Sequence, residues 1–290
     1  MIVGAHQPHY LPWIRWFDKL ARCDVFILLD DVQFTKNGYQ NRVKIKHAQG
    51  SMLLTVPVLD PVGKAIRDVD INAGTRWRSK HRAALATNYV KAPYYARYRD
   101  LVESIYDRPW TSLFDCIEYA LGLLLPALGI RTRLVRSSDL GIPGKGTDRL
   151  IDLCRAVGAT VYLTGDFAVG RHFDPAAFAP HGIEVRQQAW QCPTYRQQYP
   201  QCGFLPELSI LDLLFNEGDR SLAVLMERPS ARSDEPGAPG PVPSGAFLPL
   251  DPAFARVRPD ETDDSSVCRA AASEGGFYTD CEAAHCSETP

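Results

Sequence analysis

Residues 1–31 read MIVGAHQPHYLPWIRWFDKLARCDVFILLDD, and this stretch decides the fold. Its first five residues form a short apolar run, which is typical of a buried strand. Across residues 12–23 the apolar side chains recur at helical spacing, and Pro12 suits the first turn of a helix. Residues 24–34 form a second apolar run rich in Val, Ile and Phe, which indicates another buried strand. A strand, a helix and a strand in this order predict two parallel strands joined by a crossover helix.

The alternation of strand and helix signals continues after residue 34. The stretch RVKIKHAQGSMLLTVPVL at 42–59 alternates around a Gln-Gly turn and predicts a β-hairpin. Helical patterns follow at 76–92, 95–106, 110–128, 146–158, 175–182 and 208–218, and strand patterns at 131–140, 159–165 and 183–190. We therefore predict an α/β fold: a mainly parallel sheet with flanking helices, a Rossmann-like or nucleotidyltransferase-like core, and the β-hairpin as an insertion.

The composition changes near residue 229. The whole chain has 290 residues, 45% of them hydrophobic, and a formal net charge of −2, as expected of a soluble globular protein. Residues 229–290 hold nine prolines, eleven acidic and four basic residues, without a periodic apolar pattern. We predict a single α/β domain, catalytic or binding, at 1–228 and a disordered acidic tail at 229–290.

The cysteines and the apolar runs predict a cytoplasmic protein without a membrane partner. The eight cysteines are scattered and none forms a CxxC pair, which favours reduced thiols and disfavours a zinc site. The first residues lack a basic region followed by a long apolar run, so we expect no export signal. The longest apolar run, 120–130, contains a proline and is too short to span a bilayer.

The loop after the first strand, HQPHYLP at 6–12, is the first candidate site. In parallel α/β sheets, ligands bind beyond the carboxyl ends of the strands. His6 and His9 could stabilise charge on a phosphate or oxyanion there, and a helix N-terminus adds N–H donors. We predict catalytic roles for both histidines and substrate contacts for Gln7 and Tyr10. The alternative is a structural His6, with Tyr10 packed in the core.

Two acids and a polar segment form the second candidate site. Asp30 and Asp31 end the second strand at the same edge of the sheet, where they could act as a base, bind Mg²⁺ or hold a ribose. Alternatively, Asp31 caps the turn. The segment TKNGYQNRVKIK at 35–46 follows and is dense in hydrogen-bond donors. Within it we predict substrate contacts for the set Lys36, Asn41, Arg42 and Lys44.

Residues 36–99 carry thirteen Lys or Arg against three Asp or Glu, with aromatic residues between them. Such a field draws anions, among them nucleotide phosphates, a sugar nucleotide or an RNA. We predict Lys80 and His81 as contacts; the alternative is a solvated helical face. Three residues complete the predicted substrate-binding set: Gly165, Tyr195 and Gln197. The GxSxG, HExxH and GxGxxG motifs and the P-loop spacing are absent from the sequence, which disfavours serine hydrolases, zincins and standard dinucleotide enzymes.

Taken together, these segments resemble the WbqC-like protein family. The resemblance rests on HQPHYLPW, FDKLARCDVFILLDDVQFTKNGYQNRVKIK, LTVPV, WRSKH, YYARY, RLIDLC, YLTG and PTYRQQYPQCGFLPELSILDLLFNEG in this order, over residues 2–218. It implies a bacterial cytoplasmic protein of surface-polysaccharide (such as O-antigen) or specialised-metabolite biosynthesis, in which an amino-sugar nucleotide is acylated with an amino acid.

From the residues and the resemblance we predict a transferase that acts on a nucleotide-linked amino sugar, by acyl or aminoacyl transfer. The expected partners are an anionic small molecule such as a nucleotide sugar and an aminoacyl donor, with ATP and Mg²⁺ as candidate cofactors. The alternatives are a glycosyl- or nucleotidyltransferase, or a non-catalytic module that binds a nucleotide sugar or RNA.

Overall fold

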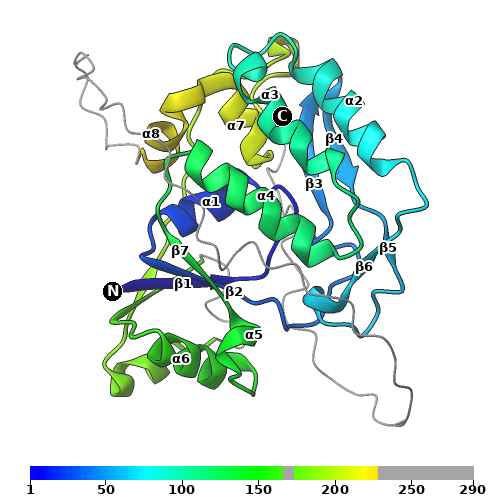
Figure 1. Cartoon of the computed structure of the whole chain (residues 1–290). Coiled ribbons are helices and arrows are strands. Elements are labelled where there is room, and N and C mark those ends of the chain that lie inside the picture. Colours follow the sequence, from blue (N-terminus) through cyan, green and yellow to red (C-terminus); the bar gives the residue numbers. More distant parts are fainter. Residues whose placement is uncertain (166–172, 228–290) are drawn as a thin grey trace, which may run out of the picture.

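The computed structural model describes residues 1–165 and 173–227. Five strands form one sheet: β1 Ile2–His6, β2 Val25–Leu28, β7 Arg133–Arg136, β8 Val161–Thr164 and β9 Glu184–Gln187. Their order across the sheet is β7-β2-β1-β8-β9, and every neighbouring pair is parallel (Figure 1). The predicted α/β fold with a mainly parallel sheet is confirmed, and in chain order the strands lie as in the first five strands of the Rossmann order 3-2-1-4-5-6. The predicted tail at 229–290 lies outside the described residues.

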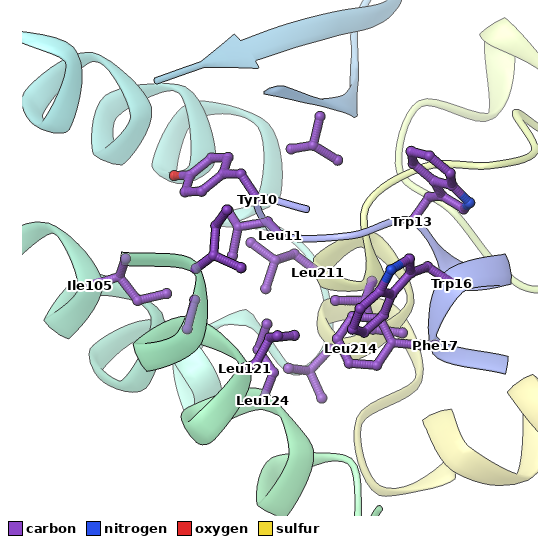
Figure 2. Close-up of a cluster of buried hydrophobic side chains, with 14 of the residues drawn as sticks. Tyr10, Leu11, Trp13, Trp16, Phe17, Ile105, Leu121, Leu124, Leu211 and Leu214 are labelled. Atoms are coloured by element: carbon purple, nitrogen blue, oxygen red, sulfur yellow. The ribbon is translucent and has the colours of Figure 1, made fainter. Parts of the chain in front are cut away.

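Helices cover both faces of the sheet, so its inner strands are apolar on both sides. Val3 of β1 and Ile27 of β2 join the core on the side of α6 (Gly146–Ala156), whereas Phe26 and Leu28 join the core on the other side. That larger core is built by α1 (Ile14–Ala21), α4 (Leu113–Ala127) and α7 (Ile210–Glu217). Figure 2 shows side chains of all three helices in contact there.

The predicted hairpin forms a separate small sheet. β3 (Arg42–His47) pairs antiparallel with β4 (Gly50–Thr55). Residues after the hairpin do not extend it: β5 (Val58–Leu59) pairs with β6 (Asp70–Ile71) instead. Pro57 separates β4 from β5, and a proline lacks the N–H that a continuing ladder needs.

The remaining helices lie near their predicted places. They are α2 (Trp77–Tyr89), α3 (Tyr95–Asp107), α5 (Ser137–Leu140) and α8 (Ser221–Met226), with 3-10 turns at Ile66–Asp68, Pro175–His181, Pro200–Cys202 and Gly218–Arg220. At 131–140 the sequence predicts a strand that leads into a loop; the strand is confirmed as β7, but the short helix α5 begins at Ser137 in place of the loop. Among the described helices, none combines the length and the apolar character needed to cross a membrane.

The connection from β1 to α1 is tightly constrained. A side chain at Gly4 would place its Cβ 2.7 Å from the Cys23 sulfur, so only glycine lets the end of α1 approach β1. Further along, Leu11 is fully buried with a φ of 44°, a conformation that non-glycine residues rarely adopt. Its carbonyl accepts a hydrogen bond from the Ser209 hydroxyl at 2.9 Å. Such strain costs about 1–3 kcal/mol and persists only where the surrounding structure enforces it.

Candidate functional site

The strand order indicates where a ligand would bind: at the carboxyl ends of β1 and β8. The chain runs from β1 to β2 on one side and later returns to β8 on the other, so the order reverses between β1 and β8. Open α/β sheets bind ligands in the crevice at such a reversal, beyond the carboxyl ends of the strands. Gly4 pairs with Leu163, and continuing this register sets Gly165 level with His6. Nothing among the described residues lies within 4 Å of a Cβ built on Gly165.

His6 ends β1 at this point and is partly exposed. Its Nδ1 lies 3.0 Å from the carbonyl oxygen of Gln7, and because that oxygen can only accept, Nδ1 carries the proton. Burial and the charge of Lys19 lower the pKa of His6 to about 3. The ring is therefore neutral at physiological pH, and its Nε2 has a lone pair without a partner among the described residues. The predicted role of His6 in stabilising charge on a phosphate or oxyanion stays a prediction.

His9 lies beside His6, with the two rings edge to face at 4.8 Å. It is 5% exposed, and its Nδ1 has no hydrogen-bond partner among the described residues. Burial also lowers the pKa of His9 well below its usual value. A series of ring contacts continues outward: His9 to Trp13 at 4.8 Å, and Trp13 to Tyr39 at 4.8 Å. We call His6, His9, Trp13 and Tyr39 the ring series.

Gln40 braces the β1–α1 loop from the other side. Its Nε2 donates to the Gln7 Oε1 at 2.6 Å, and its backbone carbonyl accepts from the Tyr10 N–H at 3.1 Å. Gln40 is 1% exposed and lies directly over Gly38, where a Cβ would come within 2.2 Å of its Oε1. The predicted Asn-Gly turn thus has a use: glycine leaves room for the amide that holds Gln7, and the Gln7 carbonyl sets the tautomer of His6.

The residues predicted to contact substrate at 36–44 differ in exposure and in their hydrogen bonds. The amide of Asn41 donates to the Val56 carbonyl at 2.8 Å and thereby joins the ends of the hairpin. Arg42 and Lys44 are partly exposed, and Lys36 lies in the preceding loop. The Arg42 guanidinium lies over the Tyr39 ring, 5.8 Å from its centre, at the outer end of the ring series.

Asp30 and Asp31 have partners inside the protein. The Asp30 carboxylate is 1% exposed and accepts three hydrogen bonds from Ser137 and Ser138 at the start of α5. Asp31 accepts from Ser137 and from the Arg149 guanidinium at 2.5 Å. Burial alone would raise the pKa of Asp31, but the bonds from Arg149 and Ser137 outweigh it and lower the pKa. Across residues 1–165 and 173–227, no group of three or more His, Cys, Asp or Glu is arranged to hold a metal ion. Both carboxylates join β2 to α5 and α6.

Tyr10 and His81 form a buried chain of hydrogen bonds. The Tyr10 hydroxyl lies 3.0 Å from both the His81 Nδ1 and the Tyr106 hydroxyl, and His81 Nε2 lies 3.1 Å from the Thr55 carbonyl. Burial lowers the pKa of His81 to about 4, so the ring is neutral. These contacts tie the β1–α1 loop to α2, α3 and β4, whereas the neighbouring Lys80 is exposed.

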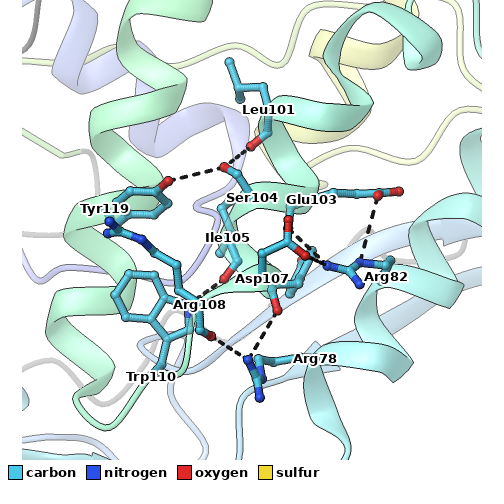
Figure 3. A network of polar contacts seen from close by, with 11 residues as sticks. Arg78, Arg82, Leu101, Glu103, Ser104, Ile105, Asp107, Arg108, Trp110 and Tyr119 are labelled. Atoms are coloured by element: carbon cyan, nitrogen blue, oxygen red, sulfur yellow. Dashed lines mark hydrogen bonds and ion pairs between the residues drawn. The ribbon is translucent and has the colours of Figure 1, made fainter.

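Half of the basic run at 76–82 serves the end of α3 (Figure 3). The Arg78 guanidinium donates to the carbonyls of Tyr106 and Arg108, and Arg82 pairs with Asp107. Cations are stabilised at a helix C-terminus, where the carbonyls lack partners. The strong positive charge of this segment is thus partly structural.

Tyr195 and Gln197 belong to a second buried group, which we call the bonded cluster: Lys46, Tyr89, Tyr195, Gln197 and Asp212. The hydroxyls of Tyr89 and Tyr195 each donate to the Asp212 carboxylate at 2.8 Å. Gln197 accepts from the buried Lys46 ammonium at 2.9 Å. These contacts hold the segment before α7 against β3 and α2. The hydrogen bonds of Tyr195 and Gln197 therefore belong to this cluster and do not connect to His6.

The sequence prediction did not select three residues of the site: Trp13, Tyr39 and Gln40. Each had a signal in the sequence. Trp13 directly follows the HQPHYLP loop, and Gln40 lies two residues after the glycine of an Asn-Gly turn. Their roles depend on contacts between segments about 30 residues apart, which periodicity does not report.

The WbqC-like protein family model matches residues 7–224, from the β1–α1 loop to α8. The chain belongs to the WbqC-like protein family. A protein of Mycobacterium tuberculosis, itself described as uncharacterised, is 37% identical over 221 residues, which cover 74% of this chain and 94% of the relative. No solved structure was found that matches the chain.

The WbqC-like match confirms the family expected from the sequence. It begins directly after β1, and it includes β8 and all members of the ring series except His6, which immediately precedes residue 7. The segment 229–290 lies beyond the matched residues.

Proposed function

We propose that this WbqC-like protein transfers an acyl group, of the aminoacyl type, to the amine of a nucleotide-linked amino sugar at the edge between β1 and β8. One observation carries the proposal: His6 presents at the reversal point of the sheet an unprotonated Nε2 that has no partner among residues 1–165 and 173–227. The family resemblance supports the class of pathway.

In this reaction the amine nitrogen attacks the acyl carbonyl carbon, a new C–N bond forms, and the bond to the leaving group breaks. His6 Nε2 accepts the proton that the amine loses and passes it to the leaving group. A ring with a pKa of about 3 is a weak base. It can act here, because bonding to the acyl carbon makes the proton on the nitrogen much more acidic than it is in the free ammonium, and the ring passes that proton on to the leaving group. The Gln7 carbonyl, held through Gln40, keeps the ring in the tautomer that this step needs.

Asp30 and Asp31 are given no part in proton transfer, since their oxygens hold Ser137, Ser138 and Arg149. The proposal needs a donor that is already activated, either with ATP or on a carrier. Each donor leaves a different co-product, which mass spectrometry of the reaction mixture distinguishes.

The test is a turnover assay on the full chain. Purified protein is screened for thermal stabilisation by nucleotide sugars and acyl donors, because a ligand at 100 times its dissociation constant stabilises by about 2.7 kcal/mol. Stabilising pairs are then combined, and amide formation is followed by mass spectrometry. His6→Ala should lower the rate by about 10²–10⁴-fold while keeping the ligand-induced thermal shift.

His181→Ala, which removes an exposed histidine from the 3-10 turn before β9, is the matched control and should react like the wild type. A folded His6→Ala protein with full turnover would contradict the proposal. So would binding of the nucleotide sugar without product from any activated donor, the result expected of a binding module.

A further inference from the structure

Arg42 is set apart from other partly buried arginines because its side chain has neither an acidic partner nor a hydrogen-bond acceptor among the described residues. Arg15 pairs with Glu207 at 2.8 Å, Arg149 with Asp31 at 2.5 Å, and Arg136 makes a two-pronged pair with Glu118. Arg42 makes no hydrogen bond or ion pair with any described residue, and its Nε is enclosed without an acceptor. An enclosed N–H of a charged group without an acceptor is costly, so it is retained where a ligand supplies the missing negative charge.

The surroundings of Arg42 hold its guanidinium in place. The group lies over the face of Tyr39, and Tyr39 lies against Trp13. Stacking on an aromatic face orients the planar guanidinium and leaves its edge free to bond in its own plane. The Arg42 side chain is partly exposed, so its terminal nitrogens reach solvent although Nε does not.

A second cation lies on the same strand face. Side chains alternate along β3, so Arg42, Lys44 and Lys46 share one face, and Val43 and Ile45 occupy the other. The Lys46 ammonium is held by Gln197 and by the Gly203 carbonyl, whereas the Lys44 side chain has no hydrogen bond or ion pair with a described residue. The residues opposite Arg42 and Lys44 on β4, Thr55 and Leu53, are uncharged.

We propose that Arg42 and Lys44 form a subsite for the phosphoryl oxyanion of the ligand, separated from His6 by the ring series. This inference rests on the proposed function and assigns the anionic end of the same substrate. A guanidinium edge binds two oxygens of one group with two parallel hydrogen bonds, and a neighbouring ammonium adds a second positive charge. A phosphoryl group, with more negative charge than a carboxylate, matches this pair of cations.

The test measures binding of inorganic pyrophosphate to the full chain by titration calorimetry at fixed salt. Arg42→Gln and Arg42→Lys should each weaken the affinity roughly tenfold or more, because lysine keeps the charge but loses the paired hydrogen bonds. Lys44→Gln should weaken it less. Arg76→Gln, which removes an exposed cation just before α2, is the control and should bind like the wild type.

Three further probes identify the ligand. Malonate tests a carboxylate in place of phosphate and should bind more weakly than pyrophosphate. UDP and glucose 1-phosphate carry the same phosphoryl chemistry from a nucleotide and from a sugar phosphate, and both should depend on Arg42. Whichever of the two binds more tightly gives the source of the phosphoryl group.

Pyrophosphate affinity that is unchanged in Arg42→Gln, affinity fully kept by Arg42→Lys, or tighter binding of malonate would each overturn the subsite. His6→Ala should leave pyrophosphate affinity unchanged. Failure of this inference is therefore separate from failure of the proposed reaction, since the first is read from binding at Arg42 and the second from turnover at His6.

Discussion

Two buried groups of polar side chains differ in how completely they are hydrogen-bonded. In the bonded cluster, the Asp212 carboxylate accepts from two tyrosines, and Lys46 and Gln197 bond each other and nearby backbone. At the β1–α1 loop and the segment that braces it, His9 Nδ1, Gln40 Oε1 and Arg42 Nε all lack partners among the described residues.

This difference in hydrogen bonding gives a physical reason to assign the two groups different roles. A buried polar atom without a partner costs roughly 1–3 kcal/mol of folding free energy. Several such atoms in one place therefore indicate a functional requirement and not a stabilising one. The described residues contain four such atoms, and three belong to this one region, next to a strained Leu11. The contrast supports a structural role for the bonded cluster and the proposed ligand-binding role for the β1–α1 loop with its brace.

The largest expected effect is on the bonded cluster. Asp212→Ala should lower the free energy of unfolding by about 3–5 kcal/mol, because it leaves two tyrosine hydroxyls and the Lys46 charge without the buried carboxylate. Asp107→Ala removes an exposed acid that pairs with Arg82 and should cost less than about 1 kcal/mol. Urea unfolding of both variants checks the contrast, and equal losses would show that Asp212 is not part of a stabilising cluster.

Next in size is the response to pH, which should differ in sign between the two groups. Burial raises the pKa of Asp212 to about 6, so its contribution to stability is complete below its unfolded value and is lost as pH rises through 6. Burial lowers the pKa of His6 to about 3, so its contribution is complete above about 6.5 and is lost as pH falls toward 3.

The wild type should therefore lose stability relative to Asp212→Asn as pH rises from about 4 to about 7, by about 1–3 kcal/mol. Relative to His6→Asn, it should lose a similar amount as pH falls over the same interval. Unfolding free energies at several pH values measure both differences, and parallel curves for wild type and either variant would contradict the corresponding burial.

The smallest expected effects come from removing one polar atom in each group: a ring nitrogen of His9 and the hydroxyl of Tyr195. His9→Leu removes a buried nitrogen that has no partner, and it should leave the free protein as stable or up to about 1 kcal/mol more stable. Tyr195→Phe removes a hydroxyl that donates to Asp212 and should cost about 1–2 kcal/mol. Thermal unfolding checks both variants. A His9→Leu protein less stable than Tyr195→Phe would mean that the His9 ring is structurally bonded after all.

Much of the fold was predictable because it depends on local patterns. The apolar runs at 1–5 and 24–34 and the helical spacing between them predicted β1, α1 and β2, and the alternation at 42–59 predicted β3 and β4. Boundaries were less certain where side-chain contacts decide them. Ser137 begins α5 directly after β7, where its hydroxyl bonds Asp30 and Asp31, and no periodic signal reports such a contact.

The candidate site was predictable in place but not in detail. The rule for parallel sheets located the HQPHYLP loop at the ligand edge. It could not tell His6 from Asp30, since both end a strand at that edge; only the partners of Asp30 in α5 show that its oxygens are occupied. Similarly, Lys44 and Lys46 are equivalent in sequence, yet Lys46 is buried under the segment that carries Gln197.

The sequence by itself determined the order of strands and helices, the loop that follows β1 and the family, because apolar periodicity and motif order are properties of neighbouring residues. The tertiary structure alone decided which polar groups are bonded and which are not. That distinction depends on a contact between segments far apart in the chain, because Gln40 holds Gln7. Two local effects complete it: Gly38 makes room for Gln40, and the Gln7 carbonyl fixes the proton of His6. Chemistry at this site depends on where one proton lies, and that is set by packing in three dimensions.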